Sequence, residues 1–434
     1  MSTSAAGTPP AGTSAADRPA AGKQTPGSQT PGTPAAVTGP GTSHQADLLV
    51  IGGGMIGLAI AWRSAQRGMT VLLADPRPAT GASHAAAGML TPVAEAAYAE
   101  RELFELGSRS LAAFGGFAAE LTELTGLDVG LRRSGTLAVG YDADDMAMLA
   151  EHAVLRESFG VPTRRLTGRE CRRLEPMLGP GISGGLLVTD DASVDPRLLA
   201  AALLAAIPAA GVVHLPRTAR AIRVAGGRAV GAELDDGTVI EAGRVVLSAG
   251  WSSGAIGGLP AGAAPPLRPV KGQILRLRPT AALTGDGAPV LTRTVRGIVQ
   301  GSPVYLVPRG DGELVLGATQ EELGPDTTVT AGGVWQLLRD ARALVPGITE
   351  FELAEAIAAL RPGTPDNAPV LGPSALPGLV LATGHFRGGV LLAPVTAEII
   401  ADYLETGQMP SFAEAFLADR FAPAATAARA GNPR

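Results

Sequence analysis

The chain has 434 residues, 46% of them hydrophobic, which is enough for a large core and for more than one domain. Its formal net charge of -5 gives no basic surface, so we expect no nucleic-acid partner. Cys171 is the single cysteine, which excludes an intramolecular disulfide, and the sequence has no His/Cys cluster with the spacing of a zinc site, so we expect no metal.

Residues 1–45 and 421–434 have the composition of disordered tails. The first consists mostly of Ala, Gly, Pro, Ser and Thr, so it cannot bury enough apolar surface to offset its ordering entropy. It lacks the apolar core of a signal peptide, and no apolar run in the chain reaches the roughly 18–20 residues that span a bilayer. We therefore expect a cytoplasmic protein with no membrane span.

A β-α-β pattern opens the folded part of the chain. Residues 47–51 and 70–74 are short apolar runs typical of strands, and residues 56–67 have helical spacing, which predicts the front of a doubly wound sheet. The elements predicted next are helices at 102–124, 146–159, 167–174 and 196–206 and strands at 137–139 and 212–215. Thr167 and Glu170 stand at capping-box spacing at the start of the third of these helices.

Antiparallel structure is predicted for the middle of the chain. Alternating residues predict a small meander with a turn at Asp236 and Gly237, and two-residue alternation from 273 to 316 predicts a larger antiparallel sheet. The remaining predicted elements are strands at 221–224, 229–234, 239–242, 244–249 and 379–382 and helices at 334–344 and 394–404.

Parallel units at both ends and antiparallel pieces between them imply two interleaved domains. The expected fold class is α/β (α+β), with a doubly wound, Rossmann-like cofactor domain interleaved with an antiparallel-sheet substrate domain. The predicted cofactor domain comprises residues 46–130, 190–265 and 356–420, and the predicted substrate domain comprises residues 131–189 and 266–355.

Gly52, Gly54 and Gly57 follow the first strand and open the first helix. In a dinucleotide site the first glycine allows a tight turn, the second lets the backbone approach a pyrophosphate, and the third lets the helix pack on the strand. Asp75 ends the second strand, 21 residues after Gly54, where a carboxylate can accept the adenosine ribose hydroxyls. The alternative is a tight strand–helix turn with a surface Asp75.

The small residues at 81–90 favour FAD over NAD. They are too poor in bulk for a core, and they let the backbone lie against a flat ring or a phosphate, to which Ser83 can hydrogen-bond. The alternative is the start of an Ala-rich helix.

Four more stretches, at 270–273, 305–309, 359–364 and 384–394, are similar to sequence motifs of one enzyme family. With the glycine motif, Asp75 and the small-residue run, they resemble the flavin amine oxidases related to D-amino acid oxidase and sarcosine oxidase, and in particular the glycine oxidases of thiamine biosynthesis. The resemblance covers residues 46–418 and implies a non-covalent FAD. It assigns the following residues to FAD binding: Gly52, Gly54, Met55, Ile56, Gly57, Asp75, Pro76, Ala82, Ser83, Ala87, Gly88, Met89, His385, Phe386, Gly388, Gly389, Val390 and Leu391.

Four residues are expected to act on the substrate. The resemblance makes Arg361 the fork that binds a substrate carboxylate, aimed by a rigid turn at Pro362 and Gly363; an arginine paired with a structural acid is the alternative. Tyr305 would donate its hydroxyl to the same carboxylate, or be a half-buried strand tyrosine. Arg387 would reach the substrate or close the site, or face solvent. Lys271 would bring an ammonium near the flavin to help electron transfer to oxygen, or be a surface charge.

No catalytic base is required by the implied mechanism. If the substrate amine is neutral, the α-hydride can pass directly to flavin N5, and the backbone at Gly388 and Gly389 with the helix that follows would stabilise charge on the reduced flavin. His385 is expected to shape the loop. Gln320 stands where some relatives carry methionine, which would make the pocket more polar.

The expected function is oxidation of glycine, and of sarcosine or D-alanine, to an imine and hydrogen peroxide for thiazole synthesis. The expected partners are a small amino acid, O2 and further copies of the chain in a homo-oligomer. A sarcosine or D-amino acid oxidase or dehydrogenase, a non-catalytic flavin-binding module and an NAD dehydrogenase are the alternatives.

Overall fold

The computed structural model describes residues 43–92, 100–281, 283 and 289–421. The two predicted tails lie largely outside these residues. The predicted limit of the first tail at residue 45 is slightly too late, because strand β1 begins at Ser43.

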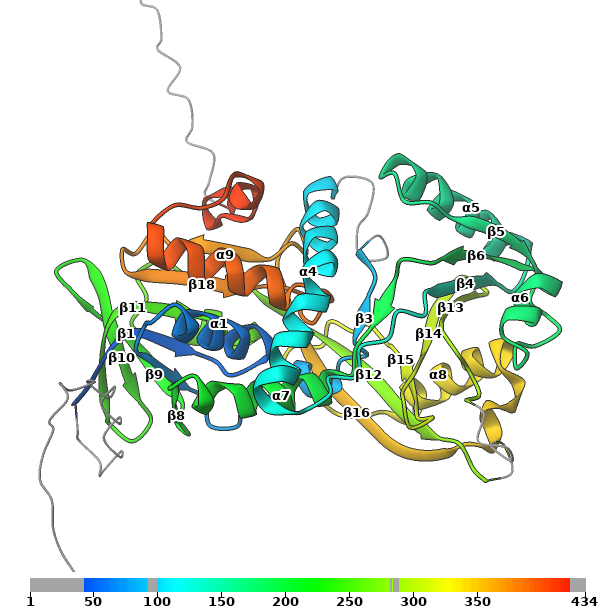
Figure 1. The fold of residues 1–434 in the computed structure, drawn as a ribbon, viewed down its shortest axis with the longest axis horizontal. Coiled ribbons are helices and arrows are strands. Elements are labelled where there is room, and N and C mark those ends of the chain that lie inside the picture. The colour runs from blue at the N-terminus through cyan, green and yellow to red at the C-terminus, as the bar shows by residue number, and fades with distance from the viewer. Residues whose placement is uncertain (1–42, 93–99, 282, 284–288, 422–434) are drawn as a thin grey trace, which may run out of the picture. The chain divides into compact units, whose positions relative to one another are not determined.

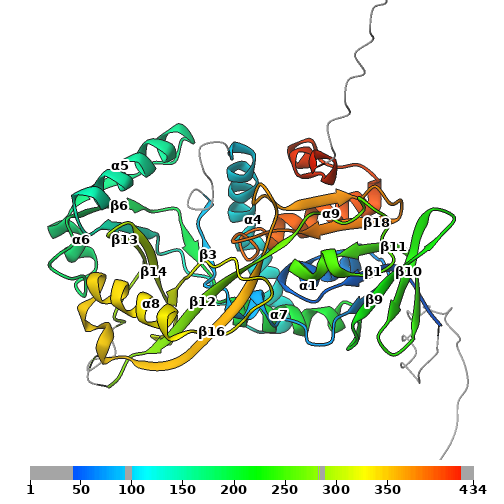
Figure 2. The same cartoon turned by 180° about the vertical axis from the view of Figure 1, so that it is seen from behind.

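The first sheet has a parallel centre (Figures 1 and 2). Its strands in spatial order are β17 (Val370–Pro373), β18 (Leu379–Thr383), β11 (Val239–Leu247), β1 (Ser43–Ile51), β2 (Val71–Ala74) and β8 (Val213–Leu215), with β9 (Ala219–Ala225) and β10 (Arg228–Leu234) joined to β11. Strands β18, β11, β1, β2 and β8 are parallel, which confirms the Rossmann-like parallel centre that the β-α-β pattern predicts. The predicted meander is β9, β10 and β11, and Gly237 takes its turn at φ +81.

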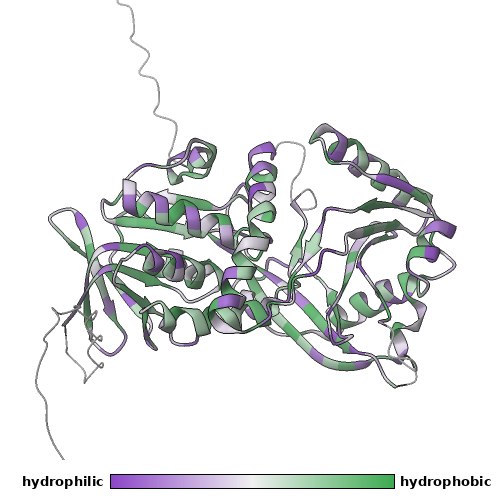
Figure 3. Ribbon diagram, viewed as in Figure 1, coloured by the Kyte–Doolittle hydropathy of each residue, from purple (hydrophilic) through white to green (hydrophobic). Residues whose placement is uncertain are grey.

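Helices cover one face of this sheet and the meander packs on the other. The helices are α1 (Met55–Gln66), α4 (Arg101–Thr125), α7 (Pro196–Ala209) and α9 (Ala393–Thr406). One apolar cluster joins them to the alternate residues Leu48 and Val50 of β1, while Leu49 and Ile51 point into a second cluster on the meander side. Figure 3 shows the largely hydrophobic strands that this two-sided burial requires.

Strand β11 replaces two predicted strands. Residues 239–242 and 244–249 were expected to form two separate strands on either side of Gly243. In the structure β11 pairs with β1 from Ser43–Val239 through to Ile51–Leu247, and Gly243 lies close against the Asp47 carbonyl. Pairing with β1 therefore outweighs the low strand propensity of glycine.

The second sheet runs mainly antiparallel, as the alternation from 273 to 316 predicts. Its strands in spatial order are β16 (Glu352–Gly363), β12 (Arg268–Arg278), β15 (Leu314–Gly317), β14 (Ser302–Pro308), β13 (Thr294–Val299), β4 (Thr136–Gly140), β6 (Gly184–Val188) and β5 (Arg164–Thr167). Only β13 and β4 pair in parallel among these strands of the described chain. Helices α8 (Ala331–Leu344) and α6 (Gly168–Leu174) cover one face, and α5 (Ala143–Ser158) packs on part of the other. The capping box of Thr167 and Glu170 is formed at the start of α6.

The twelve-residue strand β16 was not predicted as a strand. It pairs with β12 over its whole length, from Glu352 to Gly363. Arg361 therefore stands inside a strand, and the expectation that a turn at Pro362 and Gly363 aims it was wrong.

The described residues lie in one compact unit, Thr38–Arg434, so the domain limits remain a prediction. The limit at 356 falls inside β16. None of the helices of the described residues is long and apolar enough to cross a membrane.

Candidate active site

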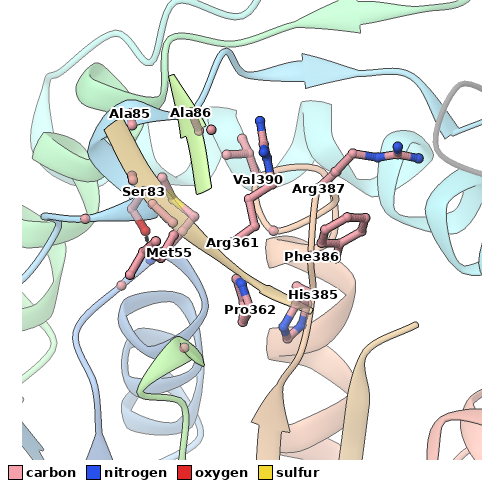
Figure 4. A pocket seen from close by; sticks show the side chains of 18 of the residues that line it. Met55, Ser83, Ala85, Ala86, Arg361, Pro362, His385, Phe386, Arg387 and Val390 are labelled. Atoms are coloured by element: carbon pink, nitrogen blue, oxygen red, sulfur yellow. Dashed lines mark hydrogen bonds between the residues drawn. The ribbon is translucent and has the colours of Figure 1, made fainter. Parts of the chain in front are cut away.

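A cavity of about 1180 Å³ lies between the two sheets, lined by residues from both. Small-ligand pockets usually have about 300–1,000 Å³, so this one has room for a dinucleotide and a small substrate. Figure 4 shows Arg361 projecting into it across from Met55 and Ser83, with His385, Phe386 and Arg387 on a neighbouring loop.

The turn between β1 and α1 forms one end of the cavity. Gly52 has φ +102, and a Cβ on Gly57 would collide with the carbonyl oxygen of Gly52. The glycines therefore have the roles that the sequence predicts, a tight turn and a close helix–strand contact. Gly52, Gly54, Met55 and Ile56 line the cavity, whereas Gly57 packs behind it.

Asp75 and Ser83 are tied to this turn by hydrogen bonds. The Gly53 N–H donates to Asp75 Oδ2 at 2.6 Å, and the Met55 N–H donates to Ser83 Oγ at 2.9 Å. Both side chains line the cavity, as do Pro76 and Ala82. Since Ser83 Oγ accepts from Met55, its hydroxyl hydrogen is left to donate to an acceptor such as a phosphate. Ser83 belongs to the short helix α2 (Ala82–Ala85), so the stretch is both a helix and part of the cavity wall.

Arg309 holds the next stretch of this wall. Its Nη2 donates to the Ala87 carbonyl at 2.8 Å and its Nη1 to the Val194 carbonyl at 3.0 Å, and Asp195 lies 3.5 Å from its Nε. Burial lowers the pKa of Arg309 to about 10, so the group stays charged at neutral pH. Ala87, Gly88 and Met89, which the sequence assigns to the flavin, line the cavity here, and Met89 lies in the two-stranded pair of β3 (Met89–Leu90) and β7 (Ala192–Ser193).

Arg361 and Tyr305 stand on the face of the second sheet that borders the cavity. Arg361 on β16 donates to the carbonyl oxygens of Thr319 and Lys271, at 3.2 and 3.4 Å. A Cβ on Gly272 of β12 would collide with its guanidinium, and a Cβ on Gly317 of β15 would collide with the Tyr305 ring. The two glycines therefore let both long side chains lie across the sheet, inside the cavity.

Lys271 lies on the opposite face. It is the strand neighbour of Gly272, and successive side chains of a strand point to opposite faces. Its buried ammonium pairs with Asp326 at 2.7 Å and Glu321 at 3.0 Å, and the hydrogen bond to Asp326 raises the pKa of Lys271. Lys271 is absent from the described residues that line the cavity, so the expectation that it acts beside the flavin was wrong.

The loop before α9 borders the cavity with His385, Phe386, Arg387, Gly389 and Val390. The His385 Nε2 lies 3.0 Å from Thr396 Oγ1 of α9, and burial lowers the pKa of His385 to about 3. A histidine that stays neutral and ties the loop to the helix shapes the loop, as the sequence predicts. Gly388 and Leu391, also predicted to bind the flavin, line a neighbouring cavity of about 180 Å³.

Sequence reasoning missed two parts of the wall. The first is formed by Ser248, Ala249, Gly250, Trp251 and Ser252. They follow the parallel strand β11, and the rule that ligands bind at the carboxyl ends of such strands could have identified them. The second is formed by His152, Arg156 and Arg296, for which the sequence offers no local signal. Gln320, expected near the substrate, lines the cavity.

The family model "DAO: FAD dependent oxidoreductase" matches residues 47–403. The chain belongs to this family. It is 36% identical over 363 residues to the bifunctional protein ThiO/ThiG of Trichormus variabilis, a match that covers 82% of this chain and 52% of the relative. It is 32% identical over 368 residues to the glycine oxidase of Geobacillus kaustophilus, covering 84% of this chain and 94% of the relative. The crystal structure of glycine oxidase from that organism superposes with a TM-score of 0.78 and 32% identity, covering 87% and 99%. The chain spans about half the length of the ThiO/ThiG relative.

The residues present fit the FAD that this family uses. The glycine turn is too tight for side chains, Ser83 and Asp75 flank it, and the cavity continues without a break to Arg361 and Tyr305. An elongated dinucleotide needs such a continuous channel, with its pyrophosphate at the start of α1.

We expect Gly57→Ala to abolish FAD retention, because the added Cβ would meet the backbone oxygen of Gly52, which cannot move without opening the turn. The measurement is the visible flavin absorbance per mole of purified protein. Gly116→Ala on α4 is the matched control, since no described atom lies within 4 Å of the added Cβ. Equal flavin content in both variants would contradict the assigned role of Gly57.

We expect His385 to make the protein less stable in acid. Its folded pKa of about 3 is below the usual value of 6.5, so below pH 6.5 the unfolded chain takes up a proton that the folded chain excludes. The resulting stabilisation is complete above pH 6.5 and falls by about 1.4 kcal/mol per pH unit toward pH 3. Urea unfolding midpoints of the holoenzyme between pH 7 and 4 should fall less steeply for His385→Gln. Parallel curves for both proteins would show that His385 is not held neutral.

Proposed function

We propose that this chain is an FAD-dependent oxidase of glycine and other small amino acids. The observation that supports it most is that two long side chains lie across glycines on the cavity face of the second sheet. The Arg361 guanidinium lies across Gly272, and the Tyr305 ring lies across Gly317. Arg361 is carried by β16 and Tyr305 by β14, which lie three positions apart in the sheet. The side chains extend over β12 and β15, the two adjacent strands between them, and so approach each other. A planar guanidinium and a phenol that converge on one spot suit a carboxylate, which accepts two parallel bonds from the first and one from the second.

The hydrogen bonds of Arg361 preorganise it for this role. Its Nη1 donates to the carbonyl oxygens of Thr319 and Lys271, which hold the guanidinium plane without neutralising its charge. An arginine held in this way binds a carboxylate in one orientation and so presents the α-carbon of an amino acid to one side of the cavity.

When bound, FAD would supply the redox chemistry, as the acceptor of the substrate's hydride that O2 reoxidises. The chain's own part is to orient the amino acid and to tolerate negative charge. Gly389 and Val390 line the cavity just before α9, whose N-terminal end carries a positive partial charge. His385 stays neutral and contributes loop geometry, and the substrate can enter as the neutral amine, so no side chain is assigned as a base. Arg387, at the edge of the same loop, is proposed to help close the site.

We further propose that the imine serves thiazole synthesis in a cytoplasmic homo-oligomer. The similarity to about half of the bifunctional protein ThiO/ThiG supports the assignment to thiazole synthesis. The single, buried Cys171 suits a reducing compartment. Gln320 on the cavity wall makes the pocket more polar than methionine would, which keeps sarcosine and D-alanine as competing substrates.

The proposal predicts that anaerobic glycine bleaches the visible flavin spectrum of the purified protein and that hydrogen peroxide appears on readmitting air. Bleaching by sarcosine or D-proline but not by glycine would change the assigned substrate and leave the proposed mechanism of hydride transfer intact. A dye reduced without peroxide would indicate a dehydrogenase. A yellow protein that no small amine reduces would reject the oxidase.

For Arg361→Met we expect kcat/KM for glycine to fall by about 100-fold, the usual cost of losing hydrogen bonds to a charged partner. Arg361→Lys should restore only part, because an ammonium lacks the fork. Gly272→Ala should raise KM as well, since its Cβ displaces the guanidinium, while Gly332→Ala on α8 meets no described atom within 4 Å and serves as the control. Steady-state kinetics with normal flavin content in all variants test this. An unchanged KM in both Arg361 variants would contradict the role of Arg361.

A further inference from the structure

A buried network of polar side chains lies behind the sheet face that borders the cavity. On β12, Lys271 and Gln273 flank Gly272, which lines the cavity, so their side chains point to the opposite face. Both side chains are buried, and both are bonded to the segment 318–330, which connects β15 to α8. Buried polar groups are stable where partners satisfy them, so the network fixes this segment against the strand.

Glu321 is at the centre of this network. Its Oε1 accepts from the Thr319 hydroxyl at 2.6 Å and from the Gln273 amide at 2.8 Å, and its Oε2 pairs with the Lys271 ammonium at 3.0 Å. Burial would raise the pKa of Glu321, but the hydrogen bonds from these three groups together outweigh burial and lower that pKa. One ionised carboxylate therefore joins the segment to β12 at neutral pH, and Asp326, 2.7 Å from the same ammonium, joins it a second time.

Glu321 also holds the two residues whose backbone carbonyl oxygens accept from Arg361. The Thr319 carbonyl lies 3.2 Å from Nη1 of Arg361, and the Thr319 hydroxyl is fixed from behind, since it donates to Glu321 and accepts from the Gln273 N–H at 2.8 Å. The Lys271 carbonyl lies 3.4 Å from the same Nη1 and accepts from the Glu321 N–H at 3.0 Å. Loss of the Glu321 contacts would therefore free both acceptors to shift.

The segment forms part of the cavity wall, but Glu321 does not. Ala318, Thr319 and Gln320 line the cavity beside Arg361, whereas Glu321 is absent from the described lining residues. An effect of Glu321 on a ligand in the cavity must therefore pass through the residues that it holds.

We propose that Glu321 is a positioning residue for Arg361, because it fixes the two backbone carbonyl oxygens that orient the guanidinium toward a substrate carboxylate. The inference rests on the proposed function, in which Arg361 binds the α-carboxylate of an amino acid. A guanidinium and a carboxylate form two parallel hydrogen bonds in one plane, so a shift of the acceptors behind the guanidinium turns that plane and weakens both bonds together. Lys271 supports the site from behind the sheet, as the counter-ion of Glu321.

The test uses two variants of the network and a matched control. Glu321→Gln removes the charge that pairs with Lys271, and Thr319→Val removes the hydroxyl while Thr319→Ser keeps it. Glu322→Gln is the control, because Glu322 is the next residue of the segment and its exposed side chain pairs with Arg268 at the surface.

The ligands are acetate, which is glycine without its amine and cannot be oxidised, and acetamide, its uncharged counterpart. Their dissociation constants are measured from shifts of the flavin spectrum of the holoenzyme. We expect Glu321→Gln and Thr319→Val to weaken acetate binding by about tenfold, since hydrogen bonds to a charged group are partly lost, and to weaken acetamide binding much less. Thr319→Ser and Glu322→Gln should bind acetate as the unmodified protein does.

A double-mutant cycle tests whether Glu321 acts through Arg361. In kcat/KM for glycine, Glu321→Gln should cost about tenfold in the unmodified enzyme and nothing further when it is added to Arg361→Met. A residue that only supports the fold would lower kcat/KM in both backgrounds.

An equal loss of acetate and acetamide binding, the same loss in Glu322→Gln as in Glu321→Gln, or a full further loss in Arg361→Met would overturn the inference. If Glu321→Gln fails to retain flavin, Thr319→Val and its rescue by Thr319→Ser decide. Equal binding of acetate and acetamide by the unmodified enzyme would overturn the inference together with the carboxylate role of Arg361. No turnover of any amine, glycine included, would reject the proposed oxidase, while the acetate and acetamide constants would still decide whether Glu321 positions Arg361.

Discussion

The buried guanidinium of Arg309 is the constraint on which the arrangement of the cavity depends. It follows β14 of the second sheet and holds two backbone carbonyls that precede β3 and α7, on the side of the first sheet. A buried charge is stable only where its acceptors stand, so the position of Ala87 and Val194 is fixed against the second sheet. The small residues at 85–89 and the sheet face that carries Arg361 and Tyr305 are thereby held on two sides of the same cavity.

Strand alternation then decides which side chains reach that cavity. Gly272, Arg361, Tyr305 and Arg296 share one face of the second sheet through their pairings, and the face behind them is sealed by the apolar cluster under α8. Because Gly272 and Gly317 have no side chains, Arg361 and Tyr305 can lie flat against the sheet and leave space above them for a substrate. The chemistry assigned to this sheet thus follows from its register as much as from the residue types.

The parts of the structure that the sequence predicts well are those with a local cause. The glycine turn needs small residues within six positions, and the capping box at Thr167 needs three. Strand β16 was missed because its Ala- and Glu-rich sequence has weak strand propensity and gains its form by pairing with β12, about 80 residues earlier. Arg156 was missed because its burial comes from packing α5 against β4 and β6, which no local pattern records. The family motif correctly brought Arg361 and Tyr305 to the cavity. Lys271 was expected beside the flavin, but it is the strand neighbour of Gly272, so strand alternation turns its side chain to the opposite face.

The ion-paired position of Lys271 also determines how the protein reacts with amine-selective reagents. The chain has only two lysines, Lys23 and Lys271, and the second is buried between Asp326 and Glu321 with its pKa raised. Acylating reagents need an exposed, neutral amine, so Lys271 is protected on both counts. A dye, crosslinker or solid support attached through a lysine side chain would therefore be carried by Lys23, outside the residues that form the two sheets and the cavity.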